Sequence, residues 1–102
     1  MKLSILSIAA LSGLAAAIDE LCSYGGAFGT CQTTSWCNGR GGRSDVTGAC
    51  PGQPANVRCC FAPRCGSGGW CDHTSARCRE FGGQFLPNLC PGPTNYRCCV
   101  GA

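Results

Sequence analysis

The cysteines of this chain form two sets of six, and no other feature restricts its fold as strongly. The first set is spaced Cys22-x8-Cys31-x5-Cys37-x12-Cys50-x8-Cys59-Cys60. The second set is spaced Cys65-x5-Cys71-x6-Cys78-x11-Cys90-x7-Cys98-Cys99. Twelve cysteines in 102 residues are typical of a small scaffold held together by disulfides. The sequence therefore predicts a cross-linked fold in place of one built on a large apolar core.

One segment of the chain occurs twice. Residues 50–61 read Cys-Pro-Gly-Gln-Pro-Ala-Asn-Val-Arg-Cys-Cys-Phe, and residues 90–100 read Cys-Pro-Gly-Pro-Thr-Asn-Tyr-Arg-Cys-Cys-Val. An internal match this close indicates one small module in two copies. We expect module 1 at residues 18–61, a linker at residues 62–64 and module 2 at residues 65–102. The linker is too short for free tumbling, so the modules should abut.

The N-terminus predicts secretion. Lys2 precedes an apolar run at residues 3–17, and small residues stand before a cleavage site that we place after Ala17. Residues 1–17 thus have the pattern of a secretory signal peptide, and the run is shorter than the roughly 20 apolar residues of a membrane span. We therefore expect a secreted, extracellular protein whose even number of cysteines forms disulfides in an oxidising compartment.

Short strands and turns are expected in both modules. In module 1, alternation places Val57, Cys59 and Phe61 on one strand face and Arg58 and Cys60 on the other. The equivalent faces in module 2 are Tyr96, Cys98 and Val100, and Arg97 and Cys99. Further strands are expected at residues 45–50 and 84–90 and around Cys31 and Cys71, type II turns at residues 51–52 and 91–92, an exposed loop at residues 38–44 and one helical turn at residues 74–80.

The order C…C…C…C…CC, with the doublet last, resembles the β-defensin pattern. Gly48 stands two residues before Cys50, where the resemblance implies a β-bulge, and Asn88 holds that position in module 2. Asn tolerates positive φ better than most residues. The resemblance implies a small, disulfide-rich, mainly β fold. It would consist of two tandem β-defensin-like modules, each a short three-stranded antiparallel sheet with three disulfides.

The resemblance also implies the pairing, which the spacing alone leaves open. The cysteines would pair first to fifth, second to fourth and third to sixth. This gives Cys22–Cys59, Cys31–Cys50 and Cys37–Cys60 in module 1, and Cys65–Cys98, Cys71–Cys90 and Cys78–Cys99 in module 2. The adjacent cysteines of each doublet point to opposite strand faces, so they naturally bridge different partners.

A second resemblance concerns the residues between and beside the cysteines. Gly-x-Cys…Cys…Cys-Pro-Gly…Asn-Val-Arg-Cys-Cys is similar to small cysteine-rich modules of secreted fungal proteins. Those modules occur beside cell-wall-degrading domains such as lysozyme-like or peptidoglycan-peptidase domains. The resemblance implies binding to a cell wall or a microbe.

Four arginines and three aromatic residues are candidates for ligand binding. Arg58 and Arg97 occupy equivalent positions beside the doublets, as a repeated contact for a polyanion or as a solvated strand face. Arg40 and Arg43 lie in a Gly-rich stretch that forms either a solvated turn or a contact for lipid, phosphate or wall polymer. Trp36 and Trp70 each precede a cysteine and either fill the small core or, like Tyr96, stack on a ligand.

Several chemistries are disfavoured. Zinc sites favour cysteines two to four residues apart with further Cys or His, whereas these close pairs are direct neighbours, so we expect no metal and no cofactor. His73 is the only histidine; it has no counterpart in module 1, and we expect an exposed loop residue, not a general base beside Asp72. A carboxylate pair of the glycosidase type stays open. After cleavage, seven arginines against five acids leave a charge of +2, far from that of a nucleic-acid binder.

These observations together predict a secreted, non-enzymatic, defensin-like antimicrobial protein. Its partner would be a microbial membrane or cell-wall polymer, namely peptidoglycan, chitin or anionic lipid, and two adjacent modules could bind a repeating polymer bivalently. The alternative is a secreted fungal effector that binds or inhibits an extracellular host or competitor protein. A small wall-lytic enzyme is a third possibility.

Overall fold

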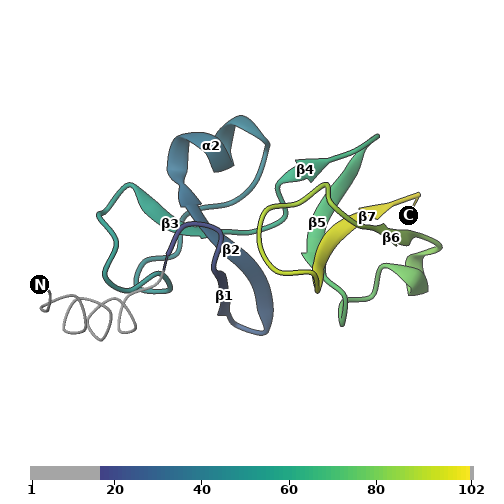
Figure 1. Ribbon diagram of the computed structural model, residues 1–102, viewed down its shortest axis with the longest axis horizontal. Helices are drawn as coiled ribbons and strands as arrows, with labels where there is room; N and C mark the ends of the chain where they lie inside the picture. Colours follow the sequence, from purple (N-terminus) through teal and green to yellow (C-terminus); the bar gives the residue numbers. More distant parts are fainter. Residues whose placement is uncertain (1–16, 102) are drawn as a thin grey trace, which may run out of the picture.

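The protein folds into two small antiparallel sheets that lie side by side (Figure 1). The computed structural model describes residues 17–101, so the expected signal peptide falls outside the described residues except for Ala17. The elements are β1 (Leu21–Tyr24), β2 (Ala27–Thr33), α2 (Thr34–Gly39), β3 (Val57–Cys60), β4 (Arg64–Cys65), β5 (Gly69–His73), the 3-10 helix η1 (Arg79–Phe81), β6 (Gln84–Leu86) and β7 (Tyr96–Val100). Within residues 17–101, no helix is long and apolar enough to cross a membrane.

The N-terminal half, residues 17–61, contains the sheet β1-β2-β3. β1 and β2 form a tight hairpin through Gly25 and Gly26, which both have positive φ, at 60° and 85°. Such a two-residue turn suits a hairpin because its twist matches that of the strands. β2 also pairs with β3, with Cys31 opposite Cys59. The strand around Cys31 is thus confirmed, whereas β1 was not predicted.

The C-terminal half, residues 65–101 together with Arg64 of β4, contains the four-stranded sheet β4-β5-β7-β6, where three strands were predicted. Its first three strands correspond to β1-β2-β3, since Cys71 lies opposite Cys98 as Cys31 lies opposite Cys59. β6 adds a strand on the other side of β7. In the N-terminal half the same position holds only a single bridge between Arg43 and Phe61.

The strand predicted at residues 45–50 is wrong, and the one at residues 84–90 is too long. Residues 45–50 include Asp45 and Gly48, residue types that are depleted in strands, and Gly48 has a positive φ of 83°. β6 begins at Gln84 as expected and carries the half-buried Phe85 and Leu86, but it ends there. Packing of side chains against the neighbouring strand favours strand formation, and the N-terminal half has Ser44 and Asp45 in place of Phe85 and Leu86.

The helix α2 was also not predicted, and its last two residues, Asn38 and Gly39, lie in the range expected for an exposed loop, residues 38–44. The Thr33 hydroxyl accepts a hydrogen bond from the Trp36 N–H at 3.2 Å and caps the helix, which is a frequent role of Thr. The disulfide between Cys37 and Cys60 ties the helix to β3. In the other half, η1 begins at Arg79, near the end of the range predicted for a helical turn.

All twelve cysteines lie in the described part of the chain, and each is in a disulfide. The bonds are Cys22–Cys59, Cys31–Cys50, Cys37–Cys60, Cys65–Cys98, Cys71–Cys90 and Cys78–Cys99. These are the pairs that the resemblance implies. Each half is therefore closed by three disulfides of its own, and no disulfide joins the two halves within residues 17–101.

Each half has a core made largely of cystine. In the N-terminal half, Val57, Cys59 and Phe61 are buried together with three further cysteines, which confirms the predicted strand face. Tyr96 and Cys98 are buried in the equivalent core of the other half. The positive φ expected at the turn glycines Gly52 (83°) and Gly92 (114°) is also confirmed. Gly48 (83°) and Asn88 (67°) have positive φ as well, but both lie outside the strands, so the β-bulge implied by the resemblance does not form there.

The two halves are in direct contact. Leu21 of β1 packs against the core of the C-terminal half, and the rings of Phe28 and His73 stack with centroids 4.4 Å apart. Pro63 in the linker is fully buried, and its carbonyl accepts a hydrogen bond from the Cys71 N–H at 2.9 Å. These contacts give the halves a defined mutual orientation.

We predict that Gly29→Ala destabilises the protein by about 1–3 kcal/mol or more, because a Cβ at this position would overlap the backbone carbonyl of Cys60 on the neighbouring strand. Gly69→Ala should behave alike, since its Cβ would meet the Cys99 carbonyl. Denaturant unfolding monitored by circular dichroism measures both. The control is Gly39→Ala, where a Cβ meets nothing within 4 Å; an equal loss in this variant would contradict the explanation.

Candidate functional site

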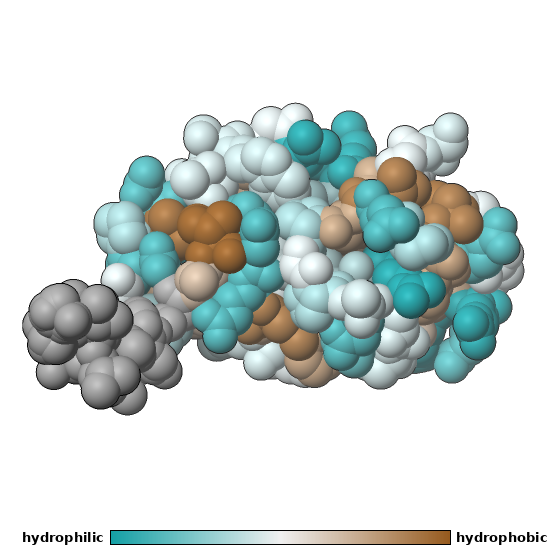
Figure 2. Space-filling model, in the orientation of Figure 1, coloured by the Kyte–Doolittle hydropathy of each residue, from teal (hydrophilic) through white to brown (hydrophobic). Residues whose placement is uncertain are grey.

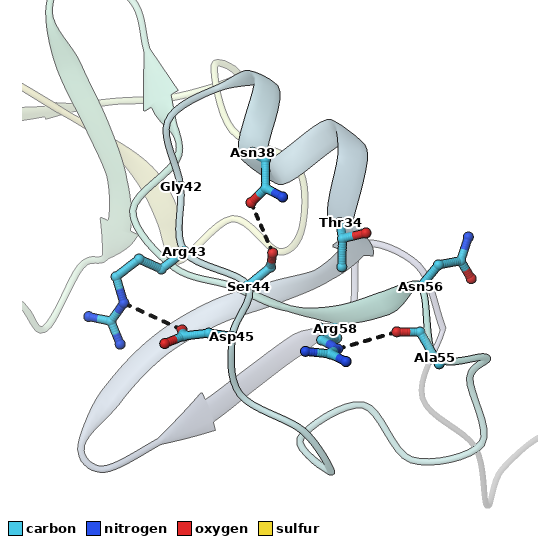
Figure 3. Close-up of a pocket in the computed structure, with 9 residues that line it drawn as sticks. All are labelled: Thr34, Asn38, Gly42, Arg43, Ser44, Asp45, Ala55, Asn56 and Arg58. Atoms are coloured by element: carbon cyan, nitrogen blue, oxygen red, sulfur yellow. Dashed lines mark hydrogen bonds and ion pairs between the residues drawn. The ribbon is translucent and has the colours of Figure 1, made fainter.

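A polar cleft of about 710 Å³ opens on the N-terminal half (Figure 3). Its walls come from α2, from the segment after that helix, from the turn before β3 and from β3 itself. The lining residues are Thr34, Asn38, Gly42, Arg43, Ser44, Asp45, Ala55, Asn56 and Arg58. The cleft is thus surrounded by two arginines, two amides and two hydroxyl groups. We call it the polar cleft.

The wall at residues 42–45 is held in place by short contacts. Gly42 donates its N–H to the Cys37 carbonyl at 2.9 Å, and a Cβ at Gly42 would lie 2.8 Å from the Cys37 sulfur. Glycine is therefore needed where this segment crosses the disulfide. The Ser44 hydroxyl donates to Asn38 Oδ1 at 3.1 Å, which links the segment to α2.

The two arginines of the polar cleft have different partners. Arg43 Nε lies 3.6 Å from Asp45 Oδ1, and both side chains are largely exposed, so this ion pair contributes little to stability. Arg58 Nε donates to the Ala55 carbonyl at 3.2 Å. That bond uses one of the five N–H donors of the guanidinium. The remaining donors of Arg58 are available to a ligand on the side where Asp45 stands (Figure 3).

The equivalent surface of the C-terminal half differs in chemistry. Arg97 Nε donates to the Thr94 carbonyl at 2.7 Å, which repeats the contact of Arg58. However, the pairing of Gln84 with Val100 corresponds to that of Arg43 with Phe61. Gln84, Phe85 and Leu86 therefore stand where the other half has Arg43, Ser44 and Asp45. Arg97 lines a hollow of about 80 Å³ beside residues 87–96, and the corresponding hollow of the N-terminal half, beside residues 47–57, measures about 280 Å³ and is separate from the polar cleft.

The other predicted binding residues lie apart from the polar cleft. The Arg40 guanidinium stacks over the Trp36 ring at 4.7 Å from its centroid, so these two candidates form a pair between α2 and the residue directly after it. Trp70 is half-buried on β5, and its Nε1 donates to Asp72 Oδ2 at 3.3 Å. Neither tryptophan belongs to the two buried core clusters.

Tyr96 is a core residue. Its side chain is only 2% exposed, so its ring offers no face to a large ligand in this structure. Its hydroxyl is buried and has no hydrogen-bond partner within residues 17–101. Burial raises the pKa of the Tyr96 phenol well above its usual range, and the nearby Asp72 carboxylate adds to this effect.

His73 and its neighbours also differ from expectation. The residue lies at the end of β5 and is half-buried, not exposed in a loop. Its Nδ1 lies 2.7 Å from the Ser75 hydroxyl, and its Nε2 lies 3.0 Å from Asn95 Nδ2. Both ring nitrogens are thus in contact with neighbouring side chains, and the ring stacks on Phe28.

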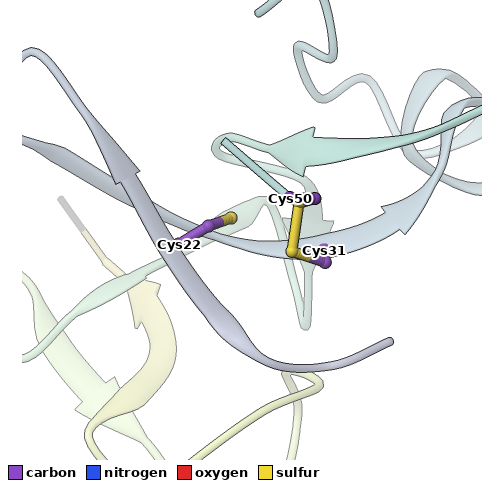
Figure 4. A group of neighbouring side chains, drawn as sticks. All are labelled: Cys22, Cys31 and Cys50. Carbon is purple, nitrogen blue, oxygen red and sulfur yellow. A yellow bond between two sulfur atoms is a disulfide. The ribbon is translucent and has the colours of Figure 1, made fainter. Parts of the chain in front are cut away.

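Two groups of three cysteine sulfurs lie close enough to hold a metal ion. In the first, the sulfurs of Cys22, Cys31 and Cys50 lie within 4.8 Å of one another (Figure 4). The second consists of Cys65, Cys71 and Cys90. In both groups two of the sulfurs are bonded to each other and the third is bonded to a cysteine of the doublet. Since the metal ligand is the thiolate, two disulfides packed together account for each group.

The sequence pointed to only part of the polar cleft. Arg43 and Arg58 were candidates, and the fold brings them together. The amides and hydroxyls of Thr34, Asn38, Ser44 and Asn56 were not singled out. Asn56 does have a counterpart in Asn95, because the repeated motif keeps an Asn before the strand. The other three have no sequence signal of their own, since their proximity depends on how α2 packs.

The chain is similar to a secreted protein of a fungus. An uncharacterized secreted protein of Arthroderma benhamiae is 43% identical over an alignment of 96 residues that covers 92% of this chain. The chain spans 38% of the length of that relative. No protein-family model and no solved structure matches the chain. The comparison thus supports secretion and a homologous cysteine-rich segment within a longer protein.

We predict that the protein loses stability as the pH rises above about 10. The unfolded chain ionises Tyr96 near pH 10.0, while the folded protein keeps the buried phenol neutral. The contribution of the neutral phenol to the free energy of unfolding is thus fully present below this pH. Above it, the free energy of unfolding falls by about 1.4 kcal/mol per pH unit. Tyr96→Phe should remove much of this fall and, because it deletes an unpaired buried hydroxyl, leave the protein at least as stable at pH 7.

Denaturant unfolding at pH 7 and pH 10.5 tests this prediction, with mass spectrometry to verify that the disulfides stay intact. Tyr24→Phe is the control, since Tyr24 is 63% exposed. If the free energy of unfolding fell between pH 7 and pH 10.5 as much in Tyr96→Phe as in the Tyr24→Phe control, groups other than Tyr96 would cause the alkaline transition.

Proposed function

We propose that this chain is a secreted, extracellular and non-enzymatic binding protein for a hydroxyl-rich, acidic polymer of the microbial envelope or cell wall. The observation that carries the proposal is the polar cleft, where Arg43 and Arg58 face the same space as side-chain amides and hydroxyls. Guanidinium groups match carboxylate and phosphate in a two-pronged geometry. Amides and hydroxyls match sugar hydroxyls. Inhibition of microbial growth would follow from this binding.

The charge of the molecule favours a polymer over a lipid membrane. The polar cleft contains two arginines and one carboxylate, whereas recognition of anionic lipid by charge typically needs about 4–8 basic residues in a cluster. On the face shown in Figure 2, hydrophobic residues form separate patches with polar residues between them. This face therefore offers no broad apolar area for insertion into lipid.

The arrangement of acids and bases supports a binding role without catalysis. Asp45 is the only carboxylate among the residues that line the polar cleft, and it is paired with Arg43. Glycoside hydrolysis generally uses two carboxylates that flank the scissile bond. His73 does not line this cleft, and its ring is packed against Phe28.

The two halves support one polar cleft, not two equal ones. Although Arg97 repeats the position and backbone contact of Arg58, its surroundings lack the counterparts of Arg43 and Asp45. A polymer would therefore bind mainly to the N-terminal half. Binding of the same ligand by two equivalent sites is not what this surface favours.

The second candidate function is a secreted effector that binds an extracellular protein. Tyr24 and Leu89 are 63% and 47% exposed, and exposed aromatic and large apolar side chains are common anchors in protein interfaces. Tight capture of one extracellular protein, combined with no binding to any wall polymer, would favour this function.

We predict that replacing both Arg43 and Arg58 by Gln weakens binding to insoluble peptidoglycan by about tenfold or more, because two charge-assisted contacts are lost. The measurement is depletion of refolded residues 18–102 from solution by peptidoglycan, with chitin and anionic vesicles as alternative surfaces, at low and physiological salt. An antimicrobial growth assay on the same samples links binding to function.

The matched control replaces Arg79 and Arg97 by Gln. It removes the same charge, and Arg97 makes the same type of backbone contact as Arg58. We expect this control to bind nearly as well as the unchanged protein. Equal losses in both double variants would mean general charge attraction and would contradict a role of the polar cleft.

A further inference from the structure

A second cleft, of about 450 Å³, lies between the two halves of the molecule. One wall is the β1–β2 hairpin, and the other is the segment from the end of β5 to η1. Figure 1 shows the β1–β2 hairpin at the lower centre, facing the segment that directly follows β5. The lining residues are Gly26, Ala27, Phe28, Asp72, Ser75, Ala76, Arg77 and Phe81. This inter-half cleft shares no residue with the polar cleft.

The shape of the inter-half cleft depends on contacts that hold the halves together. Phe28 supplies part of one wall, and its ring is stacked on the ring of His73. The His73 ring is in turn held by Ser75 and Asn95. Near the linker, the Arg64 N–H donates to the Arg40 carbonyl at 2.8 Å. Since Pro63 of the short linker is fully buried and these contacts join the halves, the cleft is a preformed feature of the folded chain.

The polar groups of this cleft are oriented by the fold. Asp72 accepts hydrogen bonds from the His73 N–H at 2.9 Å and from Trp70 Nε1 at 3.3 Å, which fixes its carboxylate. Arg77 lies 6.0 Å from the centroid of the Phe81 ring and pairs with Glu80 at 3.2 Å. The cleft thus presents a positioned acceptor and a positioned donor.

Phe81 is the unusual member of this cleft. Its side chain is 62% exposed, although burial of a phenylalanine is worth about 1.5–3 kcal/mol. It lies at the end of η1, directly before Gly82, whose φ of 86° ends the helix. The fold therefore displays an aromatic ring at the rim of a hollow that also contains Phe28, Ala27 and Ala76.

The ligand class follows from this combination. The lining contains one carboxylate, Asp72, and one guanidinium, Arg77, and Arg77 is already paired with Glu80. The cleft therefore does not favour a polyanion, and it lacks the cluster of acids that a polycation would need. Sites for small ligands combine aromatic and apolar walls with a few placed polar groups. A sugar ring has an apolar face of C–H groups and a rim of hydroxyls, which match Phe81 and the Asp72, Ser75 and Arg77 side chains.

We propose that the inter-half cleft is a binding site for a neutral chain of pyranose sugars. The proposal goes beyond the function proposed above, because it concerns another site and an uncharged ligand. One wall comes from each half, so both cysteine-rich halves are needed for the site. An extended proline-rich peptide is the rival ligand, since it also packs on exposed aromatic rings.

The test is an NMR titration of ¹⁵N-labelled residues 18–102 with a soluble oligomer of N-acetylglucosamine and with one of glucose. We expect saturable shifts of the amides of Phe28, Ser75, Arg77 and Phe81 with at least one oligomer. Phe81→Ala should weaken that binding by about tenfold or more, as for an aromatic anchor. Tyr24→Ala is the matched control, because Tyr24 is 63% exposed and does not line the cleft; it should bind as the unchanged protein does.

Three outcomes would overturn the proposal. These are an absence of shifts with both oligomers, shifts confined to the residues of the polar cleft, and saturable binding of a proline-rich peptide at Phe81 without binding of either sugar. The variant with Arg43→Gln and Arg58→Gln separates the two sites, since it should retain sugar binding here while losing peptidoglycan binding. The spectrum of Phe81→Ala without ligand shows whether its fold is preserved.

Discussion

Cys59 and Cys60 are adjacent on β3, and their side chains leave the strand in opposite directions to bridge β1 and α2. A third disulfide, Cys31–Cys50, secures the long turn before β3. The remaining structure of this half depends on these links, because few apolar side chains are buried beside the cysteines. Cross-links lower the conformational entropy of the unfolded chain, and each typical disulfide thereby raises the free energy of unfolding by about 2–4 kcal/mol. They so stabilise a half that is too small for an ordinary core.

A cystine core leaves most side chains on the surface without a packing role. The two halves keep the same disulfides and the same first three strands, but they have different surfaces beside those strands. Arg43, Ser44 and Asp45 form part of a polar cleft in one half, whereas Phe85 and Leu86 belong to the strand β6, which pairs with β7, in the other. Function in such a scaffold is expected to reside in these variable positions, because the cysteines maintain the backbone independently of them.

The contact between the halves adds a property that neither half has alone. Leu21 packs into the core of the C-terminal half, and a Cβ at Gly92 would lie 2.8 Å from Cγ2 of the buried Thr30. Close packing of this kind fixes the relative position of the two sheets. It also brings Phe28 to the same hollow as Phe81, so the arrangement of two similar halves creates a surface with its own chemistry.

Local patterns in the sequence determined the strand face of Val57 and Phe61 and the positive φ at Gly52 and Asn88, because alternation and turn preferences act over a few residues. The repeated cysteine order likewise indicated two similar units. Tertiary structure decided that residues 45–50 form no strand, that α2 begins at Thr34 and that Asn38 and Ser44 join Arg58 in one cleft. Those features depend on packing between segments distant in the chain, and a sequence pattern contains no direct record of such distances.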